Sequence, residues 1–200
     1  MKKFSIAVLT NFAFTIVGIA MLFLHRALLP TGVFVVLLSI ESGLHHYYDT
    51  YLTRRLDYLG MFTVLISAML MMAGLSNSLN IILTAAIGIG IVKKFGPSRV
   101  ILGILLGLSF LTMGAVLWNN VSPYFALRSV AEISFITAIG YMFNFIGDHI
   151  HEPFHSTIHG IGWHVVISWG LLRFSEVIIF ALYKVSLNTK MAATIQLLLT

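Results

Sequence analysis

Long apolar runs separated by short polar connections dominate the sequence. Seven runs stand out, at residues 4–24, 28–48, 57–75, 79–92, 100–118, 125–147 and 155–184. An α-helix needs about 20 predominantly apolar residues to cross the hydrocarbon core of a bilayer, and most of these runs reach about that length. The fourth run is short, so we expect its helix to be tilted or to thin the bilayer locally. The pattern predicts seven membrane-spanning helices joined by loops of a few residues.

The composition is typical of an integral membrane protein. Of the 200 residues, 58% are hydrophobic and only 10% are charged, and the mean hydropathy is +0.96. A soluble domain of this size cannot bury so much apolar surface. Because the loops leave no room for a soluble domain, we expect residues 1–200 to form a single all-α domain, a seven-transmembrane helix bundle.

Basic residues gather in the connections, where they determine membrane topology. With the N-terminus inside the cell, the inner segments hold Lys2, Lys3, Arg54, Arg55, Lys93, Lys94 and Arg99, and the outer segments hold Arg26, Arg128, Lys184 and Lys190. This excess predicts a cytoplasmic N-terminus and an outside C-terminus, in what we expect to be a bacterial inner membrane. The net charge of +5 then reflects topology and does not indicate a nucleic-acid partner.

The first run follows two lysines, as the apolar part of a signal peptide does. It is long for a signal peptide, and no small-residue cleavage site follows it. We therefore expect a retained first helix.

Titratable side chains collect at the ends of three runs that this topology puts on the cytoplasmic side. His46 lies near the end of the second run, Asp57 begins the third, and His155 and His159 begin the last. Residues four apart share one face of a helix, so His155 and His159 can approach one ion, and Ser42 lies one turn before His46. Ionisable residues in membrane helices are functional candidates.

These residues predict a zinc site with hydrolytic chemistry. Since the chain has no cysteine, a metal would be held by His, carboxylate or hydroxyl groups, which favours zinc or a similar ion. His46, His155 and His159 would supply three imidazoles and leave the fourth position to water. Asp57 would take a proton from that water, and Ser42 would donate a hydrogen bond to the substrate carbonyl or the developing oxyanion.

Three short stretches resemble motifs of the CREST superfamily, which includes the alkaline ceramidases, the progestin and adipoQ receptors and the Per1-type GPI-anchor remodelling proteins. The residues of these stretches are most similar to those of the myomaker-like branch. The resemblance implies a zinc ion held by His46, His155 and His159, with Asp57 near its water and Ser42 in support. It also implies lipid amide hydrolysis, as in the ceramidases, or a membrane-fusion role, as in myomaker-like proteins. The stretches are Ser42-x3-His46-Tyr47-Tyr48-Asp49, Leu56-Asp57-Tyr58-Leu59-Gly60 and His155-Ser156-x-x-His159.

His164 is the alternative partner of His159. The pair Trp163-His164 resembles the Trp-His that closes the ceramidase motif. Five residues, however, span about 140° around an α-helix, which is poor for sharing one ion. We therefore prefer His155 as the partner of His159.

The other polar residues of the helices have plainer interpretations. We expect His45 and His164 to be hydrogen-bond partners between helices or interfacial side chains. The segment 148–152, with its two histidines, is expected to be a solvated loop, and a weak second metal site is the alternative. Arg173 and Glu176 are three residues apart, which predicts an ion pair within one helix.

Together these observations predict a zinc-dependent membrane hydrolase with a membrane lipid amide or ester as its substrate. The first alternative is a non-enzymatic lipid-binding, membrane-remodelling or receptor protein in which zinc ties helices together. The other alternative is an ion or proton carrier, which would need a continuous polar path across the bundle.

Overall fold

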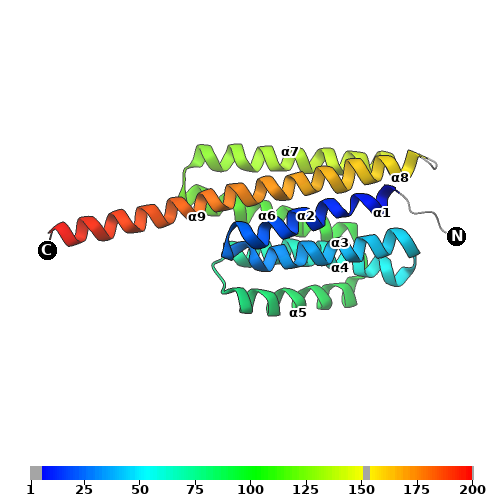
Figure 1. The fold of residues 1–200 in the computed structure, drawn as a ribbon, viewed down its shortest axis with the longest axis horizontal. Helices are drawn as coiled ribbons and strands as arrows, with labels where there is room; N and C mark the ends of the chain where they lie inside the picture. The colour runs from blue at the N-terminus through cyan, green and yellow to red at the C-terminus, as the bar shows by residue number, and fades with distance from the viewer. Residues whose placement is uncertain (1–5, 151–153, 200) are drawn as a thin grey trace.

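The chain folds into helices that share one long direction (Figure 1). The computed structural model describes residues 6–150 and 154–199, with residues 148 and 187–199 by their backbone alone. Within these ranges there is no strand, so the prediction of an all-α fold is confirmed. In chain order the elements are α1 (Ile6–Thr10), α2 (Phe12–Leu24), the 3-10 turn η1 (Arg26–Leu28), α3 (Leu29–Tyr48), α4 (Tyr51–Met72), α5 (Asn77–Phe95), α6 (Arg99–Asn120), α7 (Pro123–Asp148), α8 (Phe154–Ile158), the π-helical η2 (His159–Val165) and α9 (Val166–Leu199).

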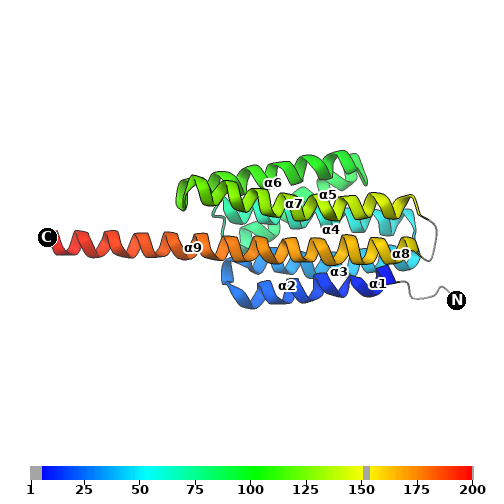
Figure 2. The ribbon, with the colours of Figure 1, turned by 90° about the horizontal axis from the view of Figure 1, so that it is seen from above.

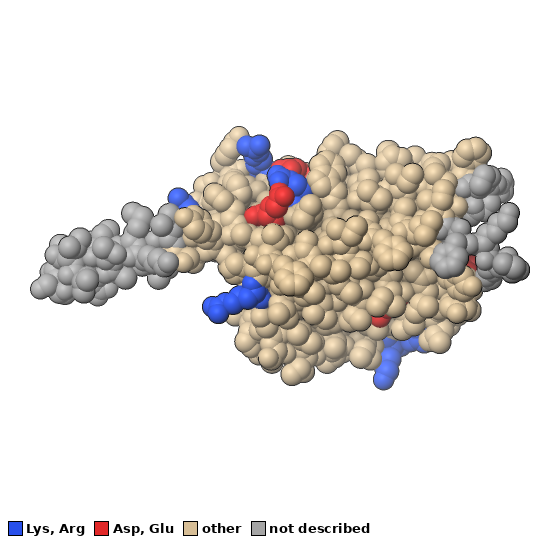
Figure 3. Space-filling view, in the orientation of Figure 1, with Lys and Arg blue, Asp and Glu red and all other residues tan. Residues whose placement is uncertain are grey.

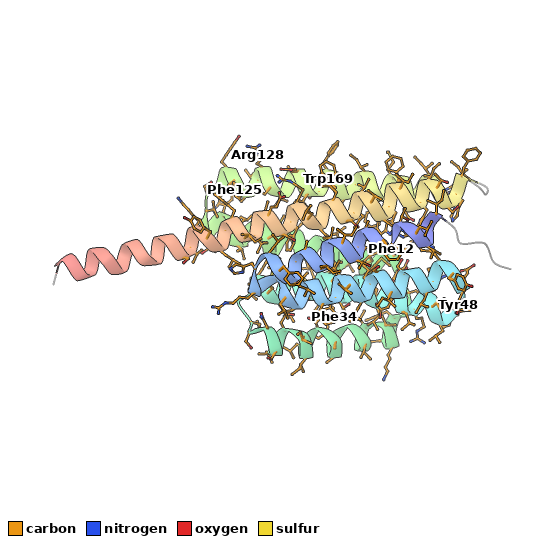
Figure 4. All side chains as sticks on the ribbon, in the orientation of Figure 1. Phe12, Phe34, Tyr48, Phe125, Arg128 and Trp169 are labelled. Carbon is orange, nitrogen blue, oxygen red and sulfur yellow. The ribbon has the colours of Figure 1, made fainter. Side chains whose placement is uncertain are left out.

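Seven helical stretches of the described chain are long and apolar enough to cross a membrane, as the seven apolar runs predicted. Many of their large apolar side chains face outward; Phe12 and Trp169, for example, are 64% and 54% exposed (Figure 4). The face drawn in Figure 3 carries few charged side chains. An apolar outer surface of this kind is compatible with an integral membrane protein. The stretches are Ile6–Leu24, Arg26–Tyr48, Tyr51–Met72, Asn77–Phe95, Arg99–Asn120, Pro123–Gly147 and Phe154–Ser186.

α4 begins earlier than the apolar pattern suggested, at Tyr51 instead of residue 57. The hydroxyl groups and backbone amides of Thr50 and Thr53 form a reciprocal capping box, which starts the helix before its apolar part. Asp49 turns the chain between α3 and α4 with φ 45°. This tight connection holds the end of α3 beside the start of α4, where the candidate residues lie.

α5 is longer than the fourth apolar run. It has 19 residues, and its last turn includes Lys93 and Lys94. Basic side chains are favourable at the C-terminal end of a helix, and Gly96, with φ 64°, ends it. The expectation of an unusually short fourth helix is therefore wrong, because charged residues continue the helix beyond its apolar part.

Six of the helices form a closed ring, in which α2, α3, α4, α6, α7 and α9 each contact the next and α9 returns to α2. α5 lies outside this ring against α4 and α3 (Figures 1 and 2). The ring is filled by buried apolar side chains, among them Met21, Val35, Met113 and Leu117. α9 continues past the other helices at its C-terminal end.

A group of buried polar side chains, which we call the Asn80 cluster, joins α3, α4 and α5. It consists of Thr31, Ser67, Asn80 and Thr84, all of them 0% exposed. The Asn80 Nδ2 donates to the Ser67 carbonyl oxygen at 3.0 Å, and its Oδ1 accepts from the hydroxyls of Ser67 and Thr84, each at 3.0 Å. The hydroxyls of Thr31 and Ser67 share a further bond of 3.2 Å. Each side chain thus has a partner, which makes the cluster a polar clamp between helices.

Candidate metal centre

Three histidines from distant parts of the chain meet at the end of the bundle where α1 lies, and we call them the histidine cluster. His46 lies near the end of α3, and His159 and His164 lie in η2. The Nε2 atom of His46 is 3.2 Å from Nε2 of His159 and 3.2 Å from Nε2 of His164. One ligand atom from each histidine lies within 4.8 Å of the other two. His164 is 0% exposed, so the cluster reaches into the interior of the bundle.

The spacing of these nitrogens fits a metal ion. At Zn–N distances of about 2.0–2.1 Å and tetrahedral angles, two ligand nitrogens lie about 3.3 Å apart, close to the 3.2 Å observed for two of the pairs. Hydrogen bonding within the cluster serves the three nitrogens poorly, because a proton on one Nε2 is shared with one neighbour at a time. A single cation would engage all three lone pairs at once.

The π-helical turn of η2 brings His159 and His164 onto one side. In a π-helix the backbone bonds join residues five apart, so residue i+5 lies one turn above residue i. η2 spans His159–Val165, and the ring centroids of His159 and His164 are 5.1 Å apart. The sequence-based argument against His164 assumed α-helical geometry and does not apply here. Single π-helical turns within α-helices occur frequently at functional sites.

Two glycines allow η2 to be held between neighbouring helices. A Cβ atom on Gly160 would lie 2.6 Å from the Thr10 Oγ1 atom and 3.1 Å from the Ala7 Cα atom of α1. A Cβ atom on Gly162 would collide with the Phe143 side chain of α7. Neither site has room for a larger residue, so the two glycines bring α1 and α7 into close contact with the π-helical turn.

His155 lies beside the histidine cluster and is not part of it. Its ring stacks on that of His159, with 5.9 Å between centroids. Its Nδ1 atom lies 2.7 Å from the Gly147 carbonyl oxygen; since a carbonyl only accepts, Nδ1 carries the proton and Nε2 the lone pair. The structure thus groups His46 and His159 with His164, where the sequence suggested His155 as the third ligand.

Asp57 and Ser42 lie together at the same end of the bundle. Ser42 is 3% exposed and lies close to the Asp57 carboxyl group. Ser42 is therefore a neighbour of the candidate base, and its donation to a substrate oxygen stays a prediction. Asp57 lines the same cavity as His46 and His159.

A polar cavity of about 830 Å³ lies in front of the histidine cluster. Asp57 and His155 are in its wall together with two members of the cluster. Asp49 and Arg54, also in the wall, form an exposed ion pair at 3.4 Å, so the cavity reaches the surface of the bundle. The site can therefore be entered by a small polar molecule.

A smaller apolar pocket of about 110 Å³ lies deeper in the bundle, between α4, α6, α7 and α9. Four residues, Met61, Leu102, Tyr141 and Trp163, line both this pocket and the polar cavity. The two spaces are therefore adjacent, one polar and at the end of the bundle, the other apolar and inside it.

The other polar residues considered in the sequence lie away from the three converging nitrogens or outside the described residues. The ion pair predicted between Arg173 and Glu176 is confirmed, and Arg173 Nε also contacts Glu132 Oε1 at 2.8 Å. The Nδ1 atom of His149 lies 2.7 Å from the Phe145 carbonyl oxygen. The Nδ1 atom of His45 is buried and has no hydrogen-bond partner among the described residues. His151 and Glu152 lie outside the described residues, so the loop and the second metal site suggested there stay predictions.

Comparison of the chain with protein-family models, curated proteins and solved structures finds no match. The resemblance to the CREST superfamily therefore stays a prediction based on three short stretches of sequence.

Proposed function

We propose that this chain is a membrane-embedded, zinc-dependent hydrolase that cleaves an amide or ester bond of a lipid. The observation that carries the proposal is the convergence of three imidazole nitrogens at the wall of a polar cavity that also contains Asp57. Catalytic zinc sites in proteins typically have three protein ligands and keep a position for water or substrate.

The proposed ligands are His46, His159 and His164. Zinc is favoured because all three donors are imidazoles, two of the three nitrogen pairs have tetrahedral spacing, and the chain has no cysteine. His155, the third ligand suggested by the sequence, presents a lone pair on Nε2 and lines the same cavity. We propose that it binds substrate or water in front of the centre.

The chemistry follows from what each side chain offers. Zinc bound to the cluster would polarise a carbonyl group and make a coordinated water more acidic. Asp57, which lies close to Ser42, accepts a proton from the attacking water. The water oxygen bonds to the carbonyl carbon, the C–N or C–O bond breaks, and the proton on Asp57 passes to the leaving amine or alcohol.

The two adjacent cavities support an amphiphilic substrate. A polar group bearing the scissile bond fits the cavity beside Asp57, and a hydrocarbon chain fits the apolar pocket behind Trp163. A molecule with both parts is a membrane lipid, which would enter sideways from the bilayer. The basic residues of the connections support a cytoplasmic N-terminus. On this orientation we propose that the site lies at the cytoplasmic face of a bacterial inner membrane.

The alternative is a non-enzymatic protein in which zinc ties α3 to η2. One observation favours this structural role. The ligands come from segments more than a hundred residues apart, so a metal would crosslink the bundle. The ion-carrier interpretation has less support, because Met113 and Leu117, both fully buried, fill the interior away from the histidines.

The test is metal content followed by hydrolysis. We expect about one zinc per chain, by mass spectrometry, in protein purified in detergent without chelators. The double variant His46→Ala, His159→Ala should lose the metal. The control His25→Ala should retain it, because His25 follows the C-terminal end of α2, far from the histidine cluster. A wild-type protein without metal would refute the proposal.

Hydrolysis then separates the enzyme from the structural alternative. Long-chain amides and esters are offered in mixed micelles to the wild type and to Asp57→Asn. The enzyme proposal expects Asp57→Asn to keep its zinc and to lose turnover. Zinc-loaded wild type that cleaves neither class of lipid would favour the structural role.

A further inference from the structure

α1, the first described helix, contacts η2 at the histidine cluster. Thr10 is its last residue, and its Oγ1 atom lies 2.9 Å from the Nδ1 atom of His164. The two residues are 154 positions apart in the chain. The nitrogen involved is the one on the far side of the ring from Nε2, which faces His46 at 3.2 Å.

The direction of this hydrogen bond can be deduced from the other partners of the hydroxyl. Thr10 Oγ1 also lies 3.0 Å from the Ile6 carbonyl oxygen and 3.1 Å from the Ala7 carbonyl oxygen. Carbonyl oxygens only accept, so the single hydroxyl proton is donated to this pair, as is common for threonine in a helix. The oxygen then accepts from His164, which puts the ring proton on Nδ1 and leaves the lone pair on Nε2.

Thr10 lies at the junction of α1 and α2, which is fixed by side-chain contacts. Asn11 separates α1 from α2, and its side-chain Nδ2 donates to the Ala7 carbonyl oxygen at 2.8 Å. The Ser39 hydroxyl of α3 donates to the Asn11 carbonyl oxygen at 2.8 Å, which fixes the junction to the rest of the bundle. The missing side chain of Gly160 leaves the space in which the Thr10 hydroxyl lies. The Ser39 bond and the space at Gly160 therefore hold the end of α1 against η2.

We propose that Thr10 is a positioning residue of the metal centre, which holds His164 in the tautomer and ring orientation that present Nε2 to the ion. This inference rests on the proposed function, because it takes the histidine cluster to be a metal site. It assigns a role to α1 that the sequence did not suggest. Partners of this kind, behind the ligands, typically contribute 10–100-fold to metal affinity.

The test compares metal affinities of the full chain in detergent. Thr10→Val keeps the shape of the side chain and removes the hydroxyl, and Thr10→Ser restores it. Zinc affinity is measured by competition with a chromophoric chelator, and the ligand field by the visible absorption of bound Co²⁺. We expect Thr10→Val to weaken zinc binding about 10–100-fold and to change the Co²⁺ spectrum, and Thr10→Ser to stay close to the wild type.

Thr137→Val is the matched control. The Thr137 hydroxyl donates to the Ile133 carbonyl oxygen four residues earlier at 2.8 Å, as that of Thr10 does within its own helix, and Thr137 lies in α7. We expect this variant to bind zinc as the wild type does. Equal weakening by both valine substitutions would show a general loss of stability and would overturn the inference.

The variant Gly160→Ala also tests the contact between Thr10 and His164, and it leaves Thr10 itself unchanged. The added methyl group would displace the Thr10 hydroxyl, so zinc affinity should fall here too, and this variant decides the matter if Thr10→Val does not fold. Wild-type affinity in the folded variants would overturn the role of Thr10 while leaving the metal site intact. A wild type that binds no metal would overturn the proposed function itself.

Discussion

The Asn80 cluster and the histidine cluster are both polar groups buried between helices, but their hydrogen-bonding atoms differ in kind. In the Asn80 cluster donors meet acceptors, as where the Asn80 amide and the Ser67 hydroxyl and carbonyl bond to each other. In the histidine cluster three equivalent Nε2 atoms converge, and His46 Nε2 is 3.2 Å from each of the other two. Because its donors and acceptors are paired with one another, the Asn80 cluster needs no further ligand to satisfy its hydrogen bonds. The ligand atoms that converge in the histidine cluster lie close enough together to bind a metal ion.

The surroundings of the two clusters differ in the same way. The Asn80 cluster is enclosed, and all four of its side chains are 0% exposed. The histidine cluster combines a fully buried His164 with partly buried His46 and His159, and it borders a cavity of about 830 Å³. A site that binds a ligand needs access, whereas a clamp between helices is strongest without it. The enclosed Asn80 cluster therefore suits a structural role, and the accessible histidine cluster suits the chemical role proposed above.

The largest effect is expected from the ligands themselves. His164→Ala should lower zinc affinity at least about 100-fold, since a lost ligand should cost no less than the most that a residue behind a ligand contributes. His155→Ala should leave zinc affinity near that of the wild type and lower hydrolytic turnover. Isothermal titration of zinc into the two purified variants measures the first effect.

The opposite ranking of these two variants would return the third ligand to His155, as the sequence suggested. It would also remove the basis for treating the π-helical turn as part of the metal site. His149→Ala, whose ring bonds the backbone of its own helix, serves as the control for a nearby histidine.

The next largest effect is expected when a chelator removes the metal, which should loosen the histidine cluster and not the Asn80 cluster. A ligand present at 100 times its dissociation constant stabilises a folded protein by about 2.7 kcal/mol. Removing the metal should therefore lower the thermal midpoint of the wild type and leave that of the His46→Ala, His159→Ala variant unchanged. Hydrogen exchange should increase in η2 and the end of α3 and remain slow in α4 around Ser67. Uniform loosening of both regions would contradict the separation of roles.

The smallest expected effect is on the Asn80 cluster. Asn80→Ala removes three hydrogen bonds. Two of these bonds join α5 to α4. At about 0.6 kcal/mol for each bond between membrane helices, the variant should lose about 1 kcal/mol of stability. Asn120→Ala, which removes an exposed bond within one helix, should lose much less. Unfolding in mixed micelles measures both.

Zinc affinity is the second readout for these asparagine variants. Asn80→Ala should retain the affinity of the wild type as long as it is folded, because its partners do not touch the histidines. A large loss of zinc binding would show that the two clusters are coupled through the bundle.

The sequence by itself determined the helices and the end of the bundle at which the candidate residues gather. Hydropathy marked seven stretches, because each helix that faces lipid or the core must be apolar along its whole length. Alternating helix direction then brought His46, Asp57 and His159 to one side, where they line a common cavity. Boundaries were less certain where polar residues continue a helix, as Lys93 and Lys94 do in α5.

Only the tertiary structure decided which histidine joins His46 and His159. The α-helical period that makes sequence patterns readable puts His164 on the wrong side of its helix. Close packing of α1 and α7 against Gly160 and Gly162 accompanies a π-helical turn that moves it back. The contact of Thr10 with His164 joins residues 154 positions apart. Which histidines lie together depends on side-chain packing between distant segments. The local pattern of apolar and polar residues contains no information on that packing.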